Sequence, residues 1–150
     1  MADEYVIGVD AGTGSVRAGL FDLQGNLIAH ASRHIRIWNP REKFFQQSSQ
    51  DIWSRVCHTV KSTLEESGVS PDSVIGISYD ATCSLVALDA NDEPISVSPD
   101  GETEQNIVVW MDHRAEGQAE RINATGEEVL KYVGGKLSPE QEPPKLLWLK

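Results

Sequence analysis

The sequence predicts an α/β fold whose sheet opens with an antiparallel β-meander and is flanked by helices. Short apolar stretches with turns between them occupy residues 5–37. A long helical pattern follows, and shorter apolar and helical stretches continue to residue 150. With 39% hydrophobic and 24% charged residues, the chain has the composition and the length to bury a hydrophobic core.

The meander is predicted from two kinds of signal, alternation and glycine turns. Residues 5–9 are rich in β-formers and lead to Asp10, and residues 11–14 form a turn. Val16, Ala18 and Leu20 then alternate with other residues, as in a half-buried strand. Gly25-Asn26 marks the next turn, and residues 27–37 form the third strand.

The first helix is predicted over residues 48–67. Ser48 or Ser49 can cap its start, and Gly68 can end it. Its apolar face repeats every fourth residue and is widened by two further side chains, so that it comprises Ile52, Trp53, Val56, Cys57, Val60 and Leu64.

The rest of the chain alternates short strands with helices. Residues 39–47 are expected to form a polar loop, and strands are expected over 74–79, 84–88 and 107–111. Helices are expected over 114–124 and 127–133, and Gly134-Gly135 ends the second. A further helix starts near Pro143, and its unfinished apolar face indicates that the chain is the front part of a longer protein.

Charge and cysteine content restrict the classes of partner. The net charge is −10, from 13 basic and 23 acidic residues, which argues against a nucleic acid or an anionic membrane as partner. No apolar run approaches the ~20 residues that cross a bilayer, and the first residues lack the basic charge of a signal peptide. Cys57 and Cys83 are expected to be reduced thiols in a cytoplasmic protein. The four histidines show no metal-binding spacing.

The most informative stretch is VIGVDAGTGSVRAGLFDLQGN, residues 6–26. It is neither a P-loop nor a dinucleotide fingerprint, because no lysine follows the glycines and the next element is a strand. The glycines therefore lie at the tip of a hairpin. The amide groups of such a turn can form a concavity that binds an anion. The alternative is an ordinary hairpin with a Thr-Gly turn and a solvated aspartate.

The side chains of the hairpin suit phosphate chemistry. Thr13 and Ser15 offer hydroxyl donors, while Gly12 and Gly14 would let a phosphate approach the backbone. A carboxylate facing phosphates needs a cation between them, so Asp10 implies Mg²⁺, held partly through water. Arg17 could add a charge-assisted hydrogen bond to a terminal phosphate.

Several motifs in order resemble the FGGY family of carbohydrate kinases. The pattern IGVDAGTGSVRA resembles the first phosphate loop of the actin, sugar-kinase and heat-shock ATPase superfamily. Later segments fall where the FGGY family has its own motifs; they are GISYDATCSL at 76–85, VWMDHR at 109–114, YVGG at 132–135 and PKLLWLK at 144–150. The resemblance implies an actin-like, ribonuclease H-like domain with a mixed sheet.

This resemblance also assigns a domain and an activity. Residues 1–150 would be the front part of the N-terminal actin-like domain of an ATP- and Mg²⁺-dependent kinase. The general base and the adenine site would lie beyond Lys150, so no catalytic residue is assigned in this chain and the chain alone is expected to be inactive. FGGY kinases are often dimers, so the resemblance admits a homodimer alongside a small-molecule sugar substrate.

The resemblance to the FGGY family also implies which residues of this chain bind ATP and sugar, because they occupy the positions of the family's motifs. The residues assigned to ATP phosphates are Asp10, Gly12, Thr13, Gly14, Ser15 and Arg17, with Asp10 also assigned to the metal. Those assigned to the sugar are Tyr79, Asp80, Ala81, Thr82, Trp110, Asp112 and Arg114. For the segment Asp112-His113-Arg114 the alternative is a helix cap with a solvated charge pair.

The expected substrate is a ketopentose, and ribulose above others. Glycerol kinases carry Arg-Glu where this chain has Ala81-Thr82, whereas the stretch YDATCS resembles the ribulokinase group. A xylulokinase or another FGGY polyol kinase is the alternative within the family. Two further alternatives are an actin-like ATPase without a sugar substrate and a non-catalytic sensor of sugar or nucleotide.

Overall fold

The computed structural model describes residues 3–150. By their contacts, the described residues divide into two compact units. Unit 1 comprises the described residues up to Arg36 together with Gln50–Thr82, and unit 2 comprises Ile37–Ser49 and Cys83–Lys150. The sequence did not predict this division, because no linker-like composition marks its boundaries.

Unit 1 contains a mixed sheet with the strand order β3-β2-β1-β5. Its strands are β1 (Tyr5–Ala11), β2 (Ser15–Asp22), β3 (Leu27–His34) and β5 (Val74–Ala81). The first three pair antiparallel, which confirms the predicted meander, and β5 pairs parallel to β1. The third strand ends at His34, three residues before the predicted end at Ile37.

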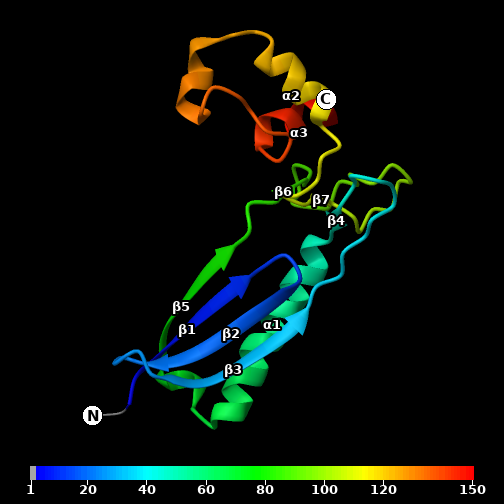
Figure 1. The fold of residues 1–150 in the computed structure, drawn as a ribbon. Coiled ribbons are helices and arrows are strands. Elements are labelled where there is room, and N and C mark those ends of the chain that lie inside the picture. The colour runs from blue at the N-terminus through cyan, green and yellow to red at the C-terminus, as the bar shows by residue number, and fades with distance from the viewer. Residues whose placement is uncertain (1–2) are drawn as a thin grey trace. The chain divides into compact units, whose positions relative to one another are not determined.

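Helix α1 (Ser49–Ser67) lies along one face of this sheet (Figure 1). The core between them contains Ile7, Val9, Val16, Ala18, Leu20, Ile35 and Val56. The predicted helix face is confirmed for Ile52, Val60 and Leu64, which pack against that core. Trp53 was wrongly placed on it, since 60% of Trp53 is exposed.

The inner face of α1 also buries two hydroxyl groups. Thr59 and Thr63 are fully buried, and each hydroxyl donates to a carbonyl one turn earlier in the helix. These bonds satisfy the hydroxyls, so threonines can occupy core positions that an apolar pattern overlooks. The helix ends before Gly68, whose φ of 67° is left-handed, and the 3₁₀ helix η1 (Pro71–Ser73) then leads to β5.

Unit 2 is built on a small sheet with the order β4-β7-β6. Its strands are β4 (Gln46–Gln47), β6 (Leu85–Val86) and β7 (Ile107–Val108), shorter than predicted for residues 84–88 and 107–111. β4 was predicted as polar loop, yet Gln46 and Gln47 are 0% and 2% exposed. Two glutamines carry no apolar signal, and only the neighbouring strand makes them part of a core.

Three helical segments follow in unit 2. They are α2 (Glu116–Asn123), the 3₁₀ helix η2 (Glu128–Val133) and α3 (Glu142–Leu149). All three were predicted, and Gly134 ends η2 with a φ of 81°, as expected of a glycine at that position. Across residues 3–150, no helix has the length and apolar character needed to cross a membrane.

Candidate functional site

The Gly-rich hairpin brings Asp10 and Arg17 together. Asp10 lies near the end of β1 and Arg17 near the start of β2, and the antiparallel register pairs them directly. Because paired residues share a face of the sheet, the Arg17 Nη2 atom lies 2.6 Å from Asp10 Oδ2. About half of each side chain is exposed, at 50% for Arg17 and 53% for Asp10. The carboxylate that was assigned to a cation therefore already has a cationic partner within the chain.

Gly12 makes room for that ion pair. A Cβ atom on Gly12 would overlap the Arg17 Nη2 atom and lie 3.3 Å from Cζ, whereas a Cβ on Gly14 would meet nothing within 4 Å. The Gly12 amide donates to the Ser15 carbonyl at 3.0 Å, so in this conformation it closes the turn and cannot also hold a phosphate. Gly12 thus leaves the space that the Arg17 guanidinium occupies, a contact that the sequence did not reveal.

The predicted phosphate and sugar segments lie side by side in unit 1. In the parallel register of β1 and β5, Asp80 is the partner of Asp10. The Thr82 amide donates to the Ala11 carbonyl at 3.1 Å, which continues this pairing past the end of β5. Arg17, Asp10 and Asp80 therefore form a row across three neighbouring strands.

This row borders a shallow groove on the sheet face opposite to α1. Its floor includes Gly8, Gly19 and Ser78, which add little or no side chain above the strands. Because side chains alternate along a strand, Asp80 points to the groove and Tyr79 and Ala81 point to the other face. Of the predicted sugar residues on β5, only Asp80 shares the face of Asp10.

Asp112 and Arg114 form a buried ion pair in unit 2. Arg114 Nη2 lies 2.8 Å from Asp112 Oδ2, and both side chains are 0% exposed. The Phe45 amide donates to the same Asp112 oxygen at 2.7 Å, and Arg114 Nη1 donates to the Val97 carbonyl at 2.8 Å. The alternative of a solvated charge pair is wrong, because neither group reaches solvent. The direct sugar contact expected of both residues is not available in this conformation, since their polar atoms face each other and the backbone.

Aromatic side chains complete the surroundings of Arg114. Its guanidinium carbon lies 4.3 Å from the ring centre of Phe44 and 4.9 Å from that of Trp148. Contact of this kind stabilises a cation that has left water. Trp148, near the end of α3, is thereby joined to the segment that carries Asp112.

Lys145 holds the segment that contains Trp110. Lys145 is 1% exposed, and its Nζ atom donates to the carbonyls of Val109, Trp110 and Glu140 at 3.1, 2.9 and 2.8 Å. Burial lowers the pKa of Lys145 below its ordinary value, although Asp112 opposes the shift. The Trp110 amide donates to the Ser84 hydroxyl. Lys145 is not among the predicted site residues, because a lysine at the start of a helix looks like an ordinary exposed residue.

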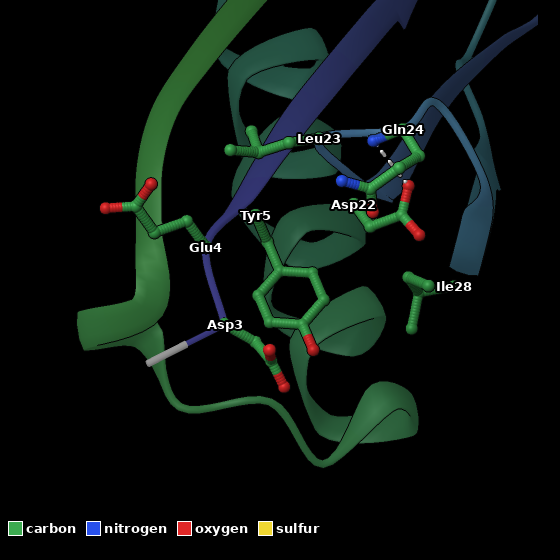
Figure 2. A pocket seen from close by; sticks show the side chains of 7 residues that line it. All are labelled: Asp3, Glu4, Tyr5, Asp22, Leu23, Gln24 and Ile28. Atoms are coloured by element: carbon green, nitrogen blue, oxygen red, sulfur yellow. Dashed lines mark hydrogen bonds between the residues drawn. The ribbon is translucent and has the colours of Figure 1, made fainter. Parts of the chain in front are cut away.

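A second pocket lies at the opposite end of β1 and contains none of the predicted site residues. Figure 2 shows its lining, which includes Tyr5, Asp22 and Gln24. Asp22 accepts hydrogen bonds from the amides of Gln24 and Asn26 and from the Asn26 side chain, which lower its pKa. Its carboxylate is therefore used by the turn between β2 and β3, and the pocket is not a candidate site.

Asp10 suits a magnesium ion that arrives with phosphates. Within residues 3–150, no group of three or more His, Cys, Asp or Glu side chains could hold a metal ion by itself. Mg²⁺ is commonly bound by one or two carboxylates together with water and substrate phosphates. Asp10, with Asp80 beside it, fits that second arrangement.

Comparison with known proteins identifies the family. The model of the FGGY family of carbohydrate kinases, N-terminal domain, matches residues 5–150. The chain belongs to the FGGY family of carbohydrate kinases. A D-ribulokinase of Saccharomyces cerevisiae is 49% identical over 149 residues, which cover 98% of this chain and 21% of the yeast protein. The chain therefore spans about a fifth of the length of that FGGY relative.

Solved structures confirm the fold. The gluconate kinase of Lactobacillus acidophilus matches with a TM-score of 0.82 at 21% identity, over 99% of this chain and 28% of that one. The glycerol kinase of Plasmodium falciparum, solved with ADP, matches with a TM-score of 0.72 at 14% identity, over 98% and 28%. The predicted α/β, actin-like fold of an FGGY kinase is thereby confirmed.

Proposed function

We propose that the protein carrying this chain transfers a phosphoryl group from ATP to a hydroxyl of a ketopentose, most specifically ribulose. The observation that carries the proposal is the pairing of β1 with β5, which aligns Asp10 with Asp80 and Ala11 with Thr82. A kinase must hold a phosphate and a hydroxyl at neighbouring positions, because phosphoryl transfer depends mainly on positioning and electrostatic stabilisation.

We assign the phosphates of ATP to the hairpin between β1 and β2. Arg17 would donate paired hydrogen bonds to a phosphate, and Thr13 and Ser15 would add hydroxyl donors. Gly12 and Gly14 would shape the turn. Mg²⁺ bound with the nucleotide would neutralise charge on the phosphates, and Asp10 would orient it through water. The ADP in the related glycerol kinase supports an adenine nucleotide.

We assign the sugar to the neighbouring segment. The Asp80 carboxylate can accept from sugar hydroxyls, and the Thr82 hydroxyl can donate or accept. Trp110 is half-buried and stays a proposed sugar residue, and Asp112 and Arg114 would act by shaping its segment. The preference for ribulose is supported by the relative named a D-ribulokinase.

The deciding experiment is an ADP-release assay on the protein at its full natural length. Mg-ATP is supplied with D-ribulose, L-ribulose, D-xylulose, ribitol or glycerol, and with no sugar. We expect a ribulose to give the highest kcat/KM. A preference for D-xylulose would favour the xylulokinase alternative. Equal ADP release without sugar would favour an actin-like ATPase, and sugar or nucleotide binding without turnover would favour a sensor.

Two further proposals concern the cellular location and the oligomeric state of the protein. We propose a cytoplasmic protein, in keeping with the expectation that its two cysteines are reduced, and a homodimer, which the family resemblance admits. Fractionation of cells and sedimentation of the purified protein would test these proposals.

A further inference from the structure

The ion pair of Arg17 with Asp10 occupies the place that the proposed function gives to a cation. The Arg17 guanidinium lies against Asp10 Oδ2 at 2.6 Å, on the same face as Asp80 in the next strand. A divalent cation that approached Asp10 alone would meet this guanidinium, so the attraction of the carboxylate would be largely cancelled.

The pair is also placed so that it can open. Both side chains are about half exposed, and ion pairs of this kind contribute little to stability. The phosphates of a nucleotide carry more negative charge than one carboxylate and can accept two hydrogen bonds from the guanidinium, whereas the ion pair here joins Arg17 Nη2 to one Asp10 oxygen.

Gly12 leaves room for the guanidinium of Arg17 beside Asp10. The guanidinium lies where a side chain on residue 12 would begin, while the same position on Gly14 is open. Gly12 has no left-handed φ that would by itself require glycine. Its lack of a side chain therefore leaves the guanidinium free to lie against Asp10.

We infer that Arg17 is an internal counter-ion that keeps Asp10 from binding a divalent cation until a nucleotide phosphate draws the guanidinium away. Gly12 is the positioning residue for this arrangement. The metal then enters together with the nucleotide and not before it. This inference rests on the proposed function for the place of the phosphates and adds the order in which the ligands bind.

The test measures binding of Mn²⁺, as a spectroscopic probe for Mg²⁺, to the full-length protein without nucleotide. Electron paramagnetic resonance reports the free Mn²⁺. We expect weak binding to the wild type and about tenfold tighter binding to Arg17→Met, because the competing charge is gone. Adding Asp10→Asn to that variant should return the Mn²⁺ affinity to the weak value of the wild type. In the wild type, ADP should lower the free Mn²⁺ concentration further than the same concentration of ADP does without protein, because ADP itself binds Mn²⁺ in solution.

A second variant tests the role of Gly12 while keeping the arginine. Gly12→Ala should displace the guanidinium and also tighten Mn²⁺ binding, whereas Gly14→Ala should bind as the wild type does. Arg41→Met is the matched control for loss of an arginine, because Arg41 forms a slightly more exposed ion pair with Asp100 in unit 2. Thermal melting verifies that each variant is folded.

Equal Mn²⁺ affinity in the wild type, Arg17→Met and Gly12→Ala would overturn the inference. Tight binding to the wild type without nucleotide would overturn it as well. The sugar assay decides the proposed function separately. If the variants bind Mn²⁺ more tightly but the wild type shows no sugar-dependent ADP release, the proposed sugar-kinase function is refuted and the counter-ion role of Arg17 is retained. If ADP release depends on sugar but the variants bind Mn²⁺ as the wild type does, only the counter-ion role is refuted.

Discussion

Asp10 has a cation on one side of it and a second carboxylate on the other. Arg17 is its partner across β2, and Asp80 is its partner across β5. In such a row, one carboxylate can face a metal–nucleotide complex while the neighbouring carboxylate accepts hydrogen bonds from the hydroxyl groups of a sugar. Individual side chains of unit 1 should therefore divide the work, with Asp10 serving the phosphates and Asp80 the sugar.

Asp10→Ala should lower kcat by about 100-fold with little change in the KM for sugar, because alignment of the phosphates matters most in the transition state. Steady-state kinetics of the full-length kinase would measure both constants. Asp72→Ala, which removes an exposed carboxylate from η1, is the control. A kcat within a few-fold of the wild type would remove Asp10 from the phosphate site.

Asp80→Ala should raise the KM for sugar about tenfold, since a hydrogen bond to a charged acceptor is worth ~1.5–3 kcal/mol. The change in kcat should be smaller than for Asp10→Ala. Asp72→Ala, which removes an exposed carboxylate outside the groove, is again the control. An unchanged KM would leave Asp80 with a role in the sheet only.

At the scale of elements, α3 is attached to the segment after β7 by one buried ammonium group. Lys145 donates three hydrogen bonds to backbone carbonyls, and its side chain has left water. Removal from water disfavours the charged form, which is the physical reason that its pKa is lowered. The attachment should therefore depend on pH in the alkaline range.

The sign of this dependence follows from proton linkage. The pKa of Lys145 is lower in the folded protein than the ordinary 10.5, so between the two values the unfolded state binds more protons. The free energy of unfolding of the wild type, relative to Lys145→Met, should therefore increase as pH rises from the folded pKa to 10.5. Urea unfolding across this range measures the difference. Lys131→Met, at an exposed lysine, is the control, and a difference that stays constant with pH would contradict the expectation.

At the scale of the whole molecule, contacts concentrate within two units that interleave along the sequence. Unit 1 contains the sheet and core under α1, and unit 2 contains the buried pair of Asp112 and Arg114. A substitution that destabilises one core should therefore lower the stability of its own unit first.

Hydrogen exchange would detect this difference. Asp112→Asn weakens a buried ion pair whose disruption costs ~3–5 kcal/mol, and it should reduce amide protection mainly in unit 2. Leu20→Ala, at a fully buried position, should cost ~2–5 kcal/mol and act mainly in unit 1. Equal loss of protection in both units from either variant would show that they unfold together.

Local patterns along the sequence were sufficient to predict the hairpin, the meander, α1 and the family. Glycine turns, two-residue alternation and a four-residue repeat arise between neighbours in the chain, so they can be predicted without a structure. The tertiary structure decided which distant residues meet. Strand pairing aligned Asp10 with Asp80, packing buried Gln46 and Gln47, and the interior of unit 2 enclosed Asp112, Arg114 and Lys145. Polar residues carry no apolar signal of burial, and the partners that satisfy their hydrogen bonds come from segments far along the chain.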